Sequence, residues 1–331
     1  MLNILITGGA GYIGRQLIYD LLRFKKYRLY VIDNFSTGNK KFLPKKVELL
    51  NCCISNDKKV YNFFKKIKID CVIHLAAYIS VEESEKKPKK YLNNNYYKSV
   101  KFVNNCIKTL KVKNFIVAST GSVYGDRVEN KLKESFATNP INFYAKSKIK
   151  LENYFLNLNI NFALLRFFNV AGADPENYTG QINKKSTHLI KIICENTIKN
   201  KLLKVYGNSY PTKDGTAIRD YIHVKDLSLI IIKIIDYITK KKFKEIINCG
   251  YGKGRSVLDI IKNANLVLPK KINYKIVNKR KGDAAKVVAD ISKLKKILKF
   301  KPKFNSLKKI IKHSYNWEKK INLIMKKNDS I

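Results

Sequence analysis

Short apolar runs alternate along the chain with stretches in which apolar residues recur every three or four positions. The apolar runs predict buried β-strands at residues 2–7, 29–32, 47–52, 70–77, 114–119 and 160–166. The helical spacing predicts α-helices at residues 12–24, 57–66, 88–110 and around Tyr144. Because strands and helices alternate in this way, we expect an α/β fold with a doubly wound parallel sheet.

The texture of the sequence changes after Asn169, where loops rich in Gly, Asp and Pro replace the regular alternation. We therefore expect a first domain at residues 1–168 and a smaller C-terminal lobe at residues 169–331. A helical stretch and an apolar run near residues 224–250 are expected to return to the first domain.

The first predicted strand leads directly into a turn that contains Gly8, Gly11 and Gly14. Glycines at this spacing allow a tight turn and a close approach of the backbone to a pyrophosphate, which is typical of Rossmann-like dinucleotide-binding domains. Asp33 ends the next strand 19 positions after Gly14, near the roughly 20 expected for an acid that binds the adenosine ribose. A carboxylate there repels the 2′-phosphate of NADP, and no arginine follows within residues 34–39, so we expect NAD.

Tyr144 and Lys148 stand four residues apart, which brings them to one face of a predicted helix. A free phenol is a poor base at neutral pH because its pKa is about 10, and a nearby ammonium lowers that pKa. Thr120 follows the strand at 115–119, at the carboxyl end where sheets of this kind bind ligands. We therefore interpret Tyr144 and Lys148 as a proton-transfer pair.

The formal net charge of +42 raises nucleic acid or an anionic membrane as a possible partner. Of the 67 basic residues, however, only eight are arginine, the residue that nucleic-acid surfaces favour, and the lysines occur in nearly every segment. We interpret the charge as a solvated surface and expect no nucleic-acid partner. No apolar run approaches the roughly 20 residues that span a bilayer, so we expect no membrane partner.

The start of the chain and the pattern of its cysteines and histidines add three expectations. Met1 leads directly into an apolar strand, so we expect no signal peptide. The six cysteines lack Cys-x-x-Cys spacing, which indicates reduced thiols in a cytoplasmic protein. His, Cys, Asp and Glu nowhere recur at metal-ligand spacing, so we expect no metal.

Motifs in the first half resemble those of the extended short-chain dehydrogenase/reductases. They are the glycine turn at 7–14, Asp33-Asn34, His74-Leu75-Ala76-Ala77, Val123-Tyr124-Gly125, and Tyr144 with Lys148. Segments of the second half are similar to the UDP-glucose 4-epimerases within that family, at residues 168–173, 210–216, 219–224 and 280–283. The resemblance extends from the first strand to about Trp317.

The resemblance implies reversible epimerisation at carbon 4 of UDP-glucose and UDP-galactose, through a 4-keto intermediate and with tightly bound NAD. Tyr144 would act as the base, Lys148 would bind the nicotinamide ribose and lower the pKa of Tyr144, and Thr120 would hold the 4-oxygen. The implied cofactor contacts are Gly8, Gly11, Tyr12, Ile13, Gly14, Asp33, Asn34, Asn94, Tyr144 and Lys148. The implied UDP-sugar contacts are Thr120, Asn169, His188, Leu189, Tyr206, Arg219, Val287, Arg280 and Asp283. A homodimer through the helices at 88–110 and around Tyr144 is also implied.

Two positions depart from the pattern of the family or modify what it implies. Cys53 stands where the family usually carries an aspartate near the adenine, so adenine must be held by backbone groups or another side chain. Val287 is smaller than the tyrosine that blocks an N-acetyl group in the family, so we expect a pocket open to UDP-N-acetylglucosamine.

Other activities of this family, and one of another class, would use parts of the same sequence pattern. A nucleotide-sugar 4,6-dehydratase needs an acid pair just after Thr120, where this chain has Gly121 and Ser122. A 4-epimerase of UDP-N-acetylglucosamine, UDP-glucuronate or a UDP-pentose would use the same residues, so these alternatives stay open. A basic, non-catalytic nucleotide- or RNA-binding protein is a remote alternative, and the intact Thr120, Tyr144 and Lys148 argue against it.

Overall fold

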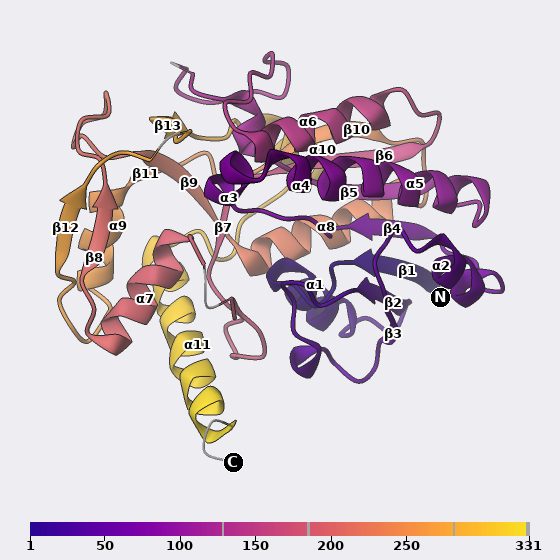
Figure 1. Cartoon of the computed structure of the whole chain (residues 1–331), viewed down its shortest axis with the longest axis horizontal. Coiled ribbons are helices and arrows are strands. Elements are labelled where there is room, and N and C mark those ends of the chain that lie inside the picture. Colours follow the sequence, from indigo (N-terminus) through magenta and orange to yellow (C-terminus); the bar gives the residue numbers. More distant parts are fainter. Residues whose placement is uncertain (128, 184–185, 281, 329–331) are drawn as a thin grey trace.

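A seven-stranded parallel sheet is built from strands within residues 2–167 and one strand from the later part of the chain (Figure 1). The structure is a computed structural model that describes residues 1–127, 129–183, 186–280 and 282–328. In spatial order the strands are β10 (Lys244–Cys249), β6 (Asn161–Phe167), β5 (Asn114–Thr120), β4 (Cys71–His74), β1 (Leu2–Thr7), β2 (Tyr27–Asp33) and β3 (Glu48–Asn51). The strand order reverses beside β1, the point at which doubly wound sheets bind ligands. The expected fold class is confirmed.

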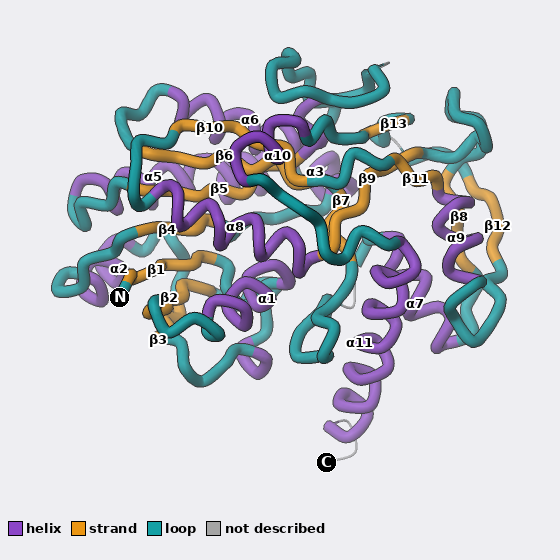
Figure 2. Tube along the Cα trace, turned by 180° about the vertical axis from the view of Figure 1, so that it is seen from behind, coloured by secondary structure: helices purple, strands orange, loops and turns teal. Residues whose placement is uncertain are grey.

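Helices cover both faces of this sheet, as Figures 1 and 2 show from opposite sides. Ile4 and Ile6 belong to one buried cluster and Leu5 to another, because successive side chains of a strand point to opposite faces. The first cluster includes residues of α1 (Tyr12–Leu21) and α8 (Val224–Ile238). The second includes residues of α2 (Asp57–Phe64), α5 (Lys98–Lys108) and α6 (Phe143–Leu156).

The second half of the chain adds two small sheets beside the large one. The first contains β11 (Gly254–Ser256), β9 (Ile218–His223), β13 (Lys286–Val287) and β7 (Asn169–Ala171). The second pairs β12 (Tyr274–Val277) with β8 (Leu203–Tyr206). Besides α8, the described helices of this half are α7 (Leu189–Lys199), α9 (Val257–Asn265), α10 (Ser292–Leu298) and α11 (Leu307–Asn328). In Figure 1, α11 runs along α7 and then extends away from the large sheet.

The helix expected at residues 88–110 is wrong as a single regular element. The chain forms α4 (Pro88–Leu92), a π-helical turn at Asn93–Tyr97, and then α5. Such π turns occur frequently at functional sites because they shift side chains out of the regular helical order. The short helix α3 (Val81–Lys86) precedes this series.

The later part of the chain contributes to the large sheet as well as to the small ones. The edge strand β10 pairs with β6 in parallel, and α8 packs against α1. The domain boundary at residue 168 itself stays a prediction. Within the described residues, no helix is both long and apolar enough to cross a membrane.

Candidate active site

A cleft of about 1340 Å³ runs from the glycine turn, past the carboxyl end of β5, to the small sheets. Pockets for one small molecule usually measure roughly 300–1,000 Å³, so this cleft has room for more than one ligand. Every predicted site residue lines it, namely Gly8, Gly11, Tyr12, Ile13, Gly14, Asp33, Asn34, Asn94, Thr120, Tyr144, Lys148, Asn169, His188, Leu189, Tyr206, Arg219, Arg280, Asp283 and Val287. Lys281, inside the predicted segment 280–283, lies outside the described residues.

The glycine turn ends the first strand and begins α1 within a few residues. A Cβ on Gly14 would lie 2.6 Å from the carbonyl oxygen of Gly8, and a Cβ on Gly8 would lie 2.8 Å from the backbone nitrogen of Ala76. Gly11 is the N-cap of α1 and provides no side-chain cap. The helix therefore begins with backbone N–H groups beside the cleft, an arrangement that suits a bound phosphate.

Asp33 is held at the edge of the cleft by the same turn. Its carboxylate accepts hydrogen bonds from the backbone N–H of Ala10 (2.9 Å) and of Phe35 (2.8 Å). Burial raises the pKa of Asp33, and the two backbone donors oppose that rise. Each carboxylate oxygen retains acceptor capacity, so the residue can also accept from a hydroxyl group of a ligand. Asn34 accepts from the backbone N–H of Ser36 at 3.1 Å.

Cys53 lines the same cleft as Asp33. Its sulfur lies 3.3 Å from the hydroxyl oxygen of Ser55. Burial on its own would raise the pKa of Cys53, but the hydrogen bonds from Ser55 and the charge of Lys98 outweigh it and lower the pKa.

Asn94 projects from the π-helical turn, where its amide donates to Asn95 at 3.1 Å. Asn95 in turn donates to the carbonyl of Tyr78 (2.9 Å) and to the hydroxyl of Ser147 (3.1 Å). The turn is thereby tied both to the cleft wall and to α6. Asn95 was missed in the sequence, where a run of three asparagines gives no sign of which one is buried.

Tyr144 lies in the first turn of α6, close to the end of β5. Asn142 caps this helix by accepting from the backbone N–H of Ala145 at 2.8 Å. The side chain of Thr120 lies close enough to the phenol of Tyr144 to favour its anion. Lys148 follows one turn later and donates to the carbonyl oxygen of Ala118 at 2.8 Å. The predicted trio of Thr120, Tyr144 and Lys148 therefore meets at one place in the cleft.

The pKa of Tyr144 differs from the expectation. Burial raises it to about 12, against the opposing effect of the hydrogen bond from Thr120. Burial also lowers the pKa of Lys148 to about 8, against the opposing charge of Glu152. In the protein alone, therefore, desolvation outweighs the effect of the ammonium, which donates to the Ala118 carbonyl.

The far end of the cleft carries aromatic and charged side chains from the second half of the chain. The guanidinium carbon of Arg280 lies 4.6 Å from the ring centre of Tyr206, and Arg280 also pairs with Asp283 at 2.8 Å. Val287 on β13 lies beside Arg219 on β9 in the parallel register. Tyr206 keeps 37% of its surface exposed, so its ring remains available to a ligand.

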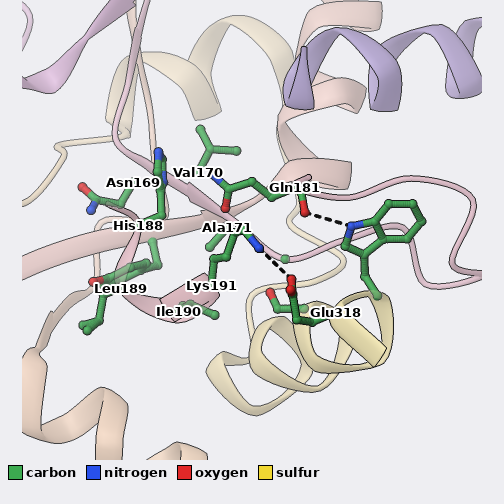
Figure 3. Close-up of a pocket in the computed structure, with 13 residues that line it drawn as sticks. Asn169, Val170, Ala171, Gln181, His188, Leu189, Ile190, Lys191 and Glu318 are labelled. Carbon is green, nitrogen blue, oxygen red and sulfur yellow. Dashed lines mark hydrogen bonds and ion pairs between the residues drawn. The ribbon is translucent and has the colours of Figure 1, made fainter. Parts of the chain in front are cut away.

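His188 lies where the cleft meets a small cavity of about 20 Å³, drawn in Figure 3 beside Asn169 and Leu189. Burial lowers the pKa of His188, against a hydrogen bond with the backbone of Val170. On the opposite side of the cavity, Lys191 pairs with Glu318 at 2.8 Å (Figure 3). This pair ties α11 to α7, so the C-terminal helix supports the His188 segment from behind.

An ion pair buried next to the predicted trio was not expected from the sequence. Arg166 and Glu152 form an ion pair with a shortest distance of 2.6 Å, and Ser119 donates to the same carboxylate. The available signal was the position of Glu152, four residues after Lys148 on one helical face. Within the described residues, no group of three His, Cys, Asp or Glu side chains could hold a metal ion.

Residues 4–250 match the NAD dependent epimerase/dehydratase family. The chain belongs to this family. A UDP-glucose 4-epimerase of Halalkalibacterium halodurans is 34% identical over 321 residues, which cover 96% of this chain and 95% of the relative. The solved UDP-glucose 4-epimerase of Bifidobacterium longum, in complex with NAD+ and UDP, is 32% identical with a TM-score of 0.90, covering 96% and 98%. The UDP-Glc/GlcNAc 4-epimerase of Campylobacter jejuni is 33% identical with a TM-score of 0.82, covering 97% and 100%.

Proposed function

We propose that this member of the epimerase/dehydratase family is an NAD-dependent isomerase that interconverts UDP-glucose and UDP-galactose at carbon 4. The observation that carries the proposal is the continuous cleft, which joins the glycine turn, Tyr144 and the Tyr206–Arg280 pair. Relatives named UDP-glucose 4-epimerase, which match almost the whole chain, support it. So does the solved relative in complex with NAD+ and UDP.

The residues around the glycine turn fit NAD. The uncapped start of α1 supplies backbone N–H donors for a pyrophosphate, and Asp33 supplies an acceptor for ribose hydroxyls. Asn94 and Lys148 would contact the cofactor further along the cleft. When bound there, NAD would supply the acceptor and donor of the hydride that is exchanged with carbon 4 of the sugar.

In this proposal Tyr144 removes the proton from the 4-hydroxyl of the sugar and later returns a proton to the 4-oxygen. Thr120, whose side chain lies beside that of Tyr144, would hold the same oxygen. A phenol with a pKa near 12 stays protonated at neutral pH and cannot take up a second proton. A nearby positive charge must therefore favour its anion. Lys148 provides one such charge.

At the other end of the cleft, Arg219 and Arg280 would bind the diphosphate. A guanidinium group binds phosphate oxygens in pairs, which a lysine ammonium cannot do. The ring of Tyr206 would pack against the uracil. Asn169, His188, Leu189 and Asp283 would complete the contacts to UDP.

UDP-N-acetylglucosamine is a second candidate substrate, favoured by a specific residue. Val287 lines the cleft and is 8% exposed, and it would border the substituent on carbon 2 of the sugar. Its small side chain would leave room for an N-acetyl group. UDP-glucuronate and UDP-pentoses stay open as alternatives.

We further propose a cytoplasmic homodimer that has no nucleic-acid partner. Tyr97 at the end of the π-helical turn and Leu156 on α6 are 58% and 51% exposed, which supports these helices as the contact between subunits. All six cysteines are free, as expected for a reducing compartment. Sedimentation equilibrium would test the dimer.

The deciding experiment is to incubate the purified protein with UDP-galactose and no added NAD, and to look for UDP-glucose by chromatography. We expect conversion to an equilibrium mixture, because the cofactor is bound tightly and is not consumed. A preparation that carries no NAD, converts nothing and binds RNA with a steep salt dependence would instead support a non-catalytic binding protein.

A further inference from the structure

The ion pair between Arg166 and Glu152 lies immediately next to Lys148 in the fold. Glu152 follows Lys148 by one turn of α6, and Arg166 on β6 lies opposite Ser119 on β5. Two guanidinium nitrogens of Arg166 contact the carboxylate, Nη2 at 2.6 Å and Nε at 3.1 Å. The hydroxyl of Ser119, the residue before Thr120, donates to the same carboxylate.

This pair is fully enclosed by protein and linked to further buried groups. Glu152 is 2% and Arg166 3% exposed. The guanidinium lies 4.8 Å from the ring centre of Tyr124, whose hydroxyl donates to Asn248 on β10 at 2.8 Å. A buried ion pair usually adds no more stability than apolar residues of similar volume. Its presence beside the reactive residues therefore calls for an explanation other than stability.

The ammonium of Lys148 provides that explanation. Its direct partner is the carbonyl oxygen of Ala118, a group without net charge. A buried ammonium is costly unless a negative charge balances it. We propose that Glu152 is a positioning residue that keeps Lys148 in its ammonium form and, through Ser119, fixes the end of β5 that carries Thr120. This proposal rests on the epimerase function proposed above.

The other titratable groups around Lys148 do not supply the charge. His74 on β4 faces Lys148, and burial lowers the pKa of His74 to about 3, with a smaller contribution from Lys148. Tyr144, with a pKa of about 12, is neutral at physiological pH. Arg166 is positive and is itself bound to Glu152. Burial already lowers the pKa of Lys148 to about 8 against the effect of Glu152, so removing that carboxylate must lower it further.

The test is the pH dependence of kcat for UDP-galactose between pH 6 and 10, with Glu152→Gln as the main variant. Glutamine keeps the size of the side chain but removes its charge. We expect the loss of activity at alkaline pH to begin at least about one pH unit lower than in the wild type. Because a lone Arg166 would then be buried without a partner, the double variant Glu152→Gln/Arg166→Gln is measured too, and the same displacement is expected.

Ser119→Ala is the matched control, since it removes a hydrogen bond to the same carboxylate without removing a charge. We expect its kcat to be lower at every pH, with the alkaline midpoint unchanged. An equal displacement of the midpoint in Ser119→Ala would refute the assignment of Glu152 as the counter-charge. So would unchanged midpoints in both variants that lack Glu152.

A second readout does not depend on turnover. Reductive methylation of Lys148, followed by peptide mass spectrometry across the same pH range, reports the fraction of free amine directly. We expect the pH midpoint of Lys148 methylation to be lower in Glu152→Gln than in the wild type and to be unchanged in Ser119→Ala. If the wild type converts no UDP-sugar, the proposed function fails, and this measurement still decides whether Glu152 controls the charge of Lys148.

Discussion

The two ends of the cleft are built in different ways. Around Tyr144 and Lys148, the side chains belong to the large parallel sheet and to α6, and Lys148 is fixed by a hydrogen bond to the backbone of β5. Around Tyr206 and Arg280, they belong to strands of two to six residues and to the loops between them. The comparison indicates that the chemistry is built into a rigid core, whereas the choice of substrate is made by parts that can change without disturbing it.

The largest effect should come from the rigid end. Tyr144→Phe removes only the phenolic oxygen, and general acid–base groups contribute about 10²–10⁴-fold to the rate. We expect kcat for UDP-galactose to fall by that factor while UDP binding, measured by calorimetry, stays unchanged. Turnover within threefold of the wild type would exclude Tyr144 as the base.

At the Tyr206–Arg280 end of the cleft, a substitution should change KM more than kcat. Arg280→Leu removes a charged hydrogen-bond donor worth about 1.5–3 kcal/mol, so we expect KM for UDP-galactose to rise roughly 10- to 100-fold with a much smaller change in kcat. Arg255→Leu is the matched control, because Arg255 pairs with Asp259 at 3.1 Å and does not line the cleft. A large loss of kcat in Arg280→Leu would show that the two ends are not independent.

A smaller effect is expected at Asp33, whose negative charge should repel the 2′-phosphate of NADP. Denatured protein should release NAD as the main dinucleotide, identified by chromatography. Asp33→Asn keeps the size of the side chain and one of the two acceptor oxygens that bind the Ala10 and Phe35 amides, and it removes the repulsion. We expect it to reduce the preference for NAD over NADP by at least about tenfold. NADP as the main species released from the wild type would overturn the role of Asp33.

The smallest effect on UDP-galactose should come from Val287→Tyr. The tyrosine would fill the space beside carbon 2, so we expect turnover of UDP-N-acetylglucosamine to disappear and turnover of UDP-galactose to stay within about threefold. Both substrates are assayed at saturating concentration. Equal loss of both activities, or no activity of the wild type on the N-acetylated sugar, would mean that Val287 is not the gate.

The same contrast explains what the sequence could predict. The large sheet follows from local alternation of strands and helices, and its fold class was predicted correctly from that pattern alone. The small sheets could not be predicted, because β13 has two residues and pairs with a strand almost 70 positions earlier. The π-helical turn at Asn93–Tyr97 was missed because an inserted residue leaves the apolar spacing of its neighbours intact.

The site shows a similar division. The glycine turn, Asp33, Tyr144 and Lys148 could be found in the sequence because local geometry fixes their spacing. The spacing of Glu152 from Lys148 was visible in the sequence, but its ion pair was not, because Arg166 and Ser119 lie on two other elements. The sequence also led us to expect a lowered pKa for Tyr144, since spacing indicates a nearby charge but not how strongly burial opposes it.

The position of β10 at the edge of the large sheet has a consequence for any attempt to divide the molecule. A fragment ending at residue 168 would lose β10 and leave the backbone groups of β6 unpaired along one edge. It would also lose α8, whose isoleucines are buried against the sheet and α1. Such a fragment should aggregate through the exposed edge. A chimaera that exchanges substrate preference between relatives must therefore keep residues 224–250 with the dinucleotide-binding part.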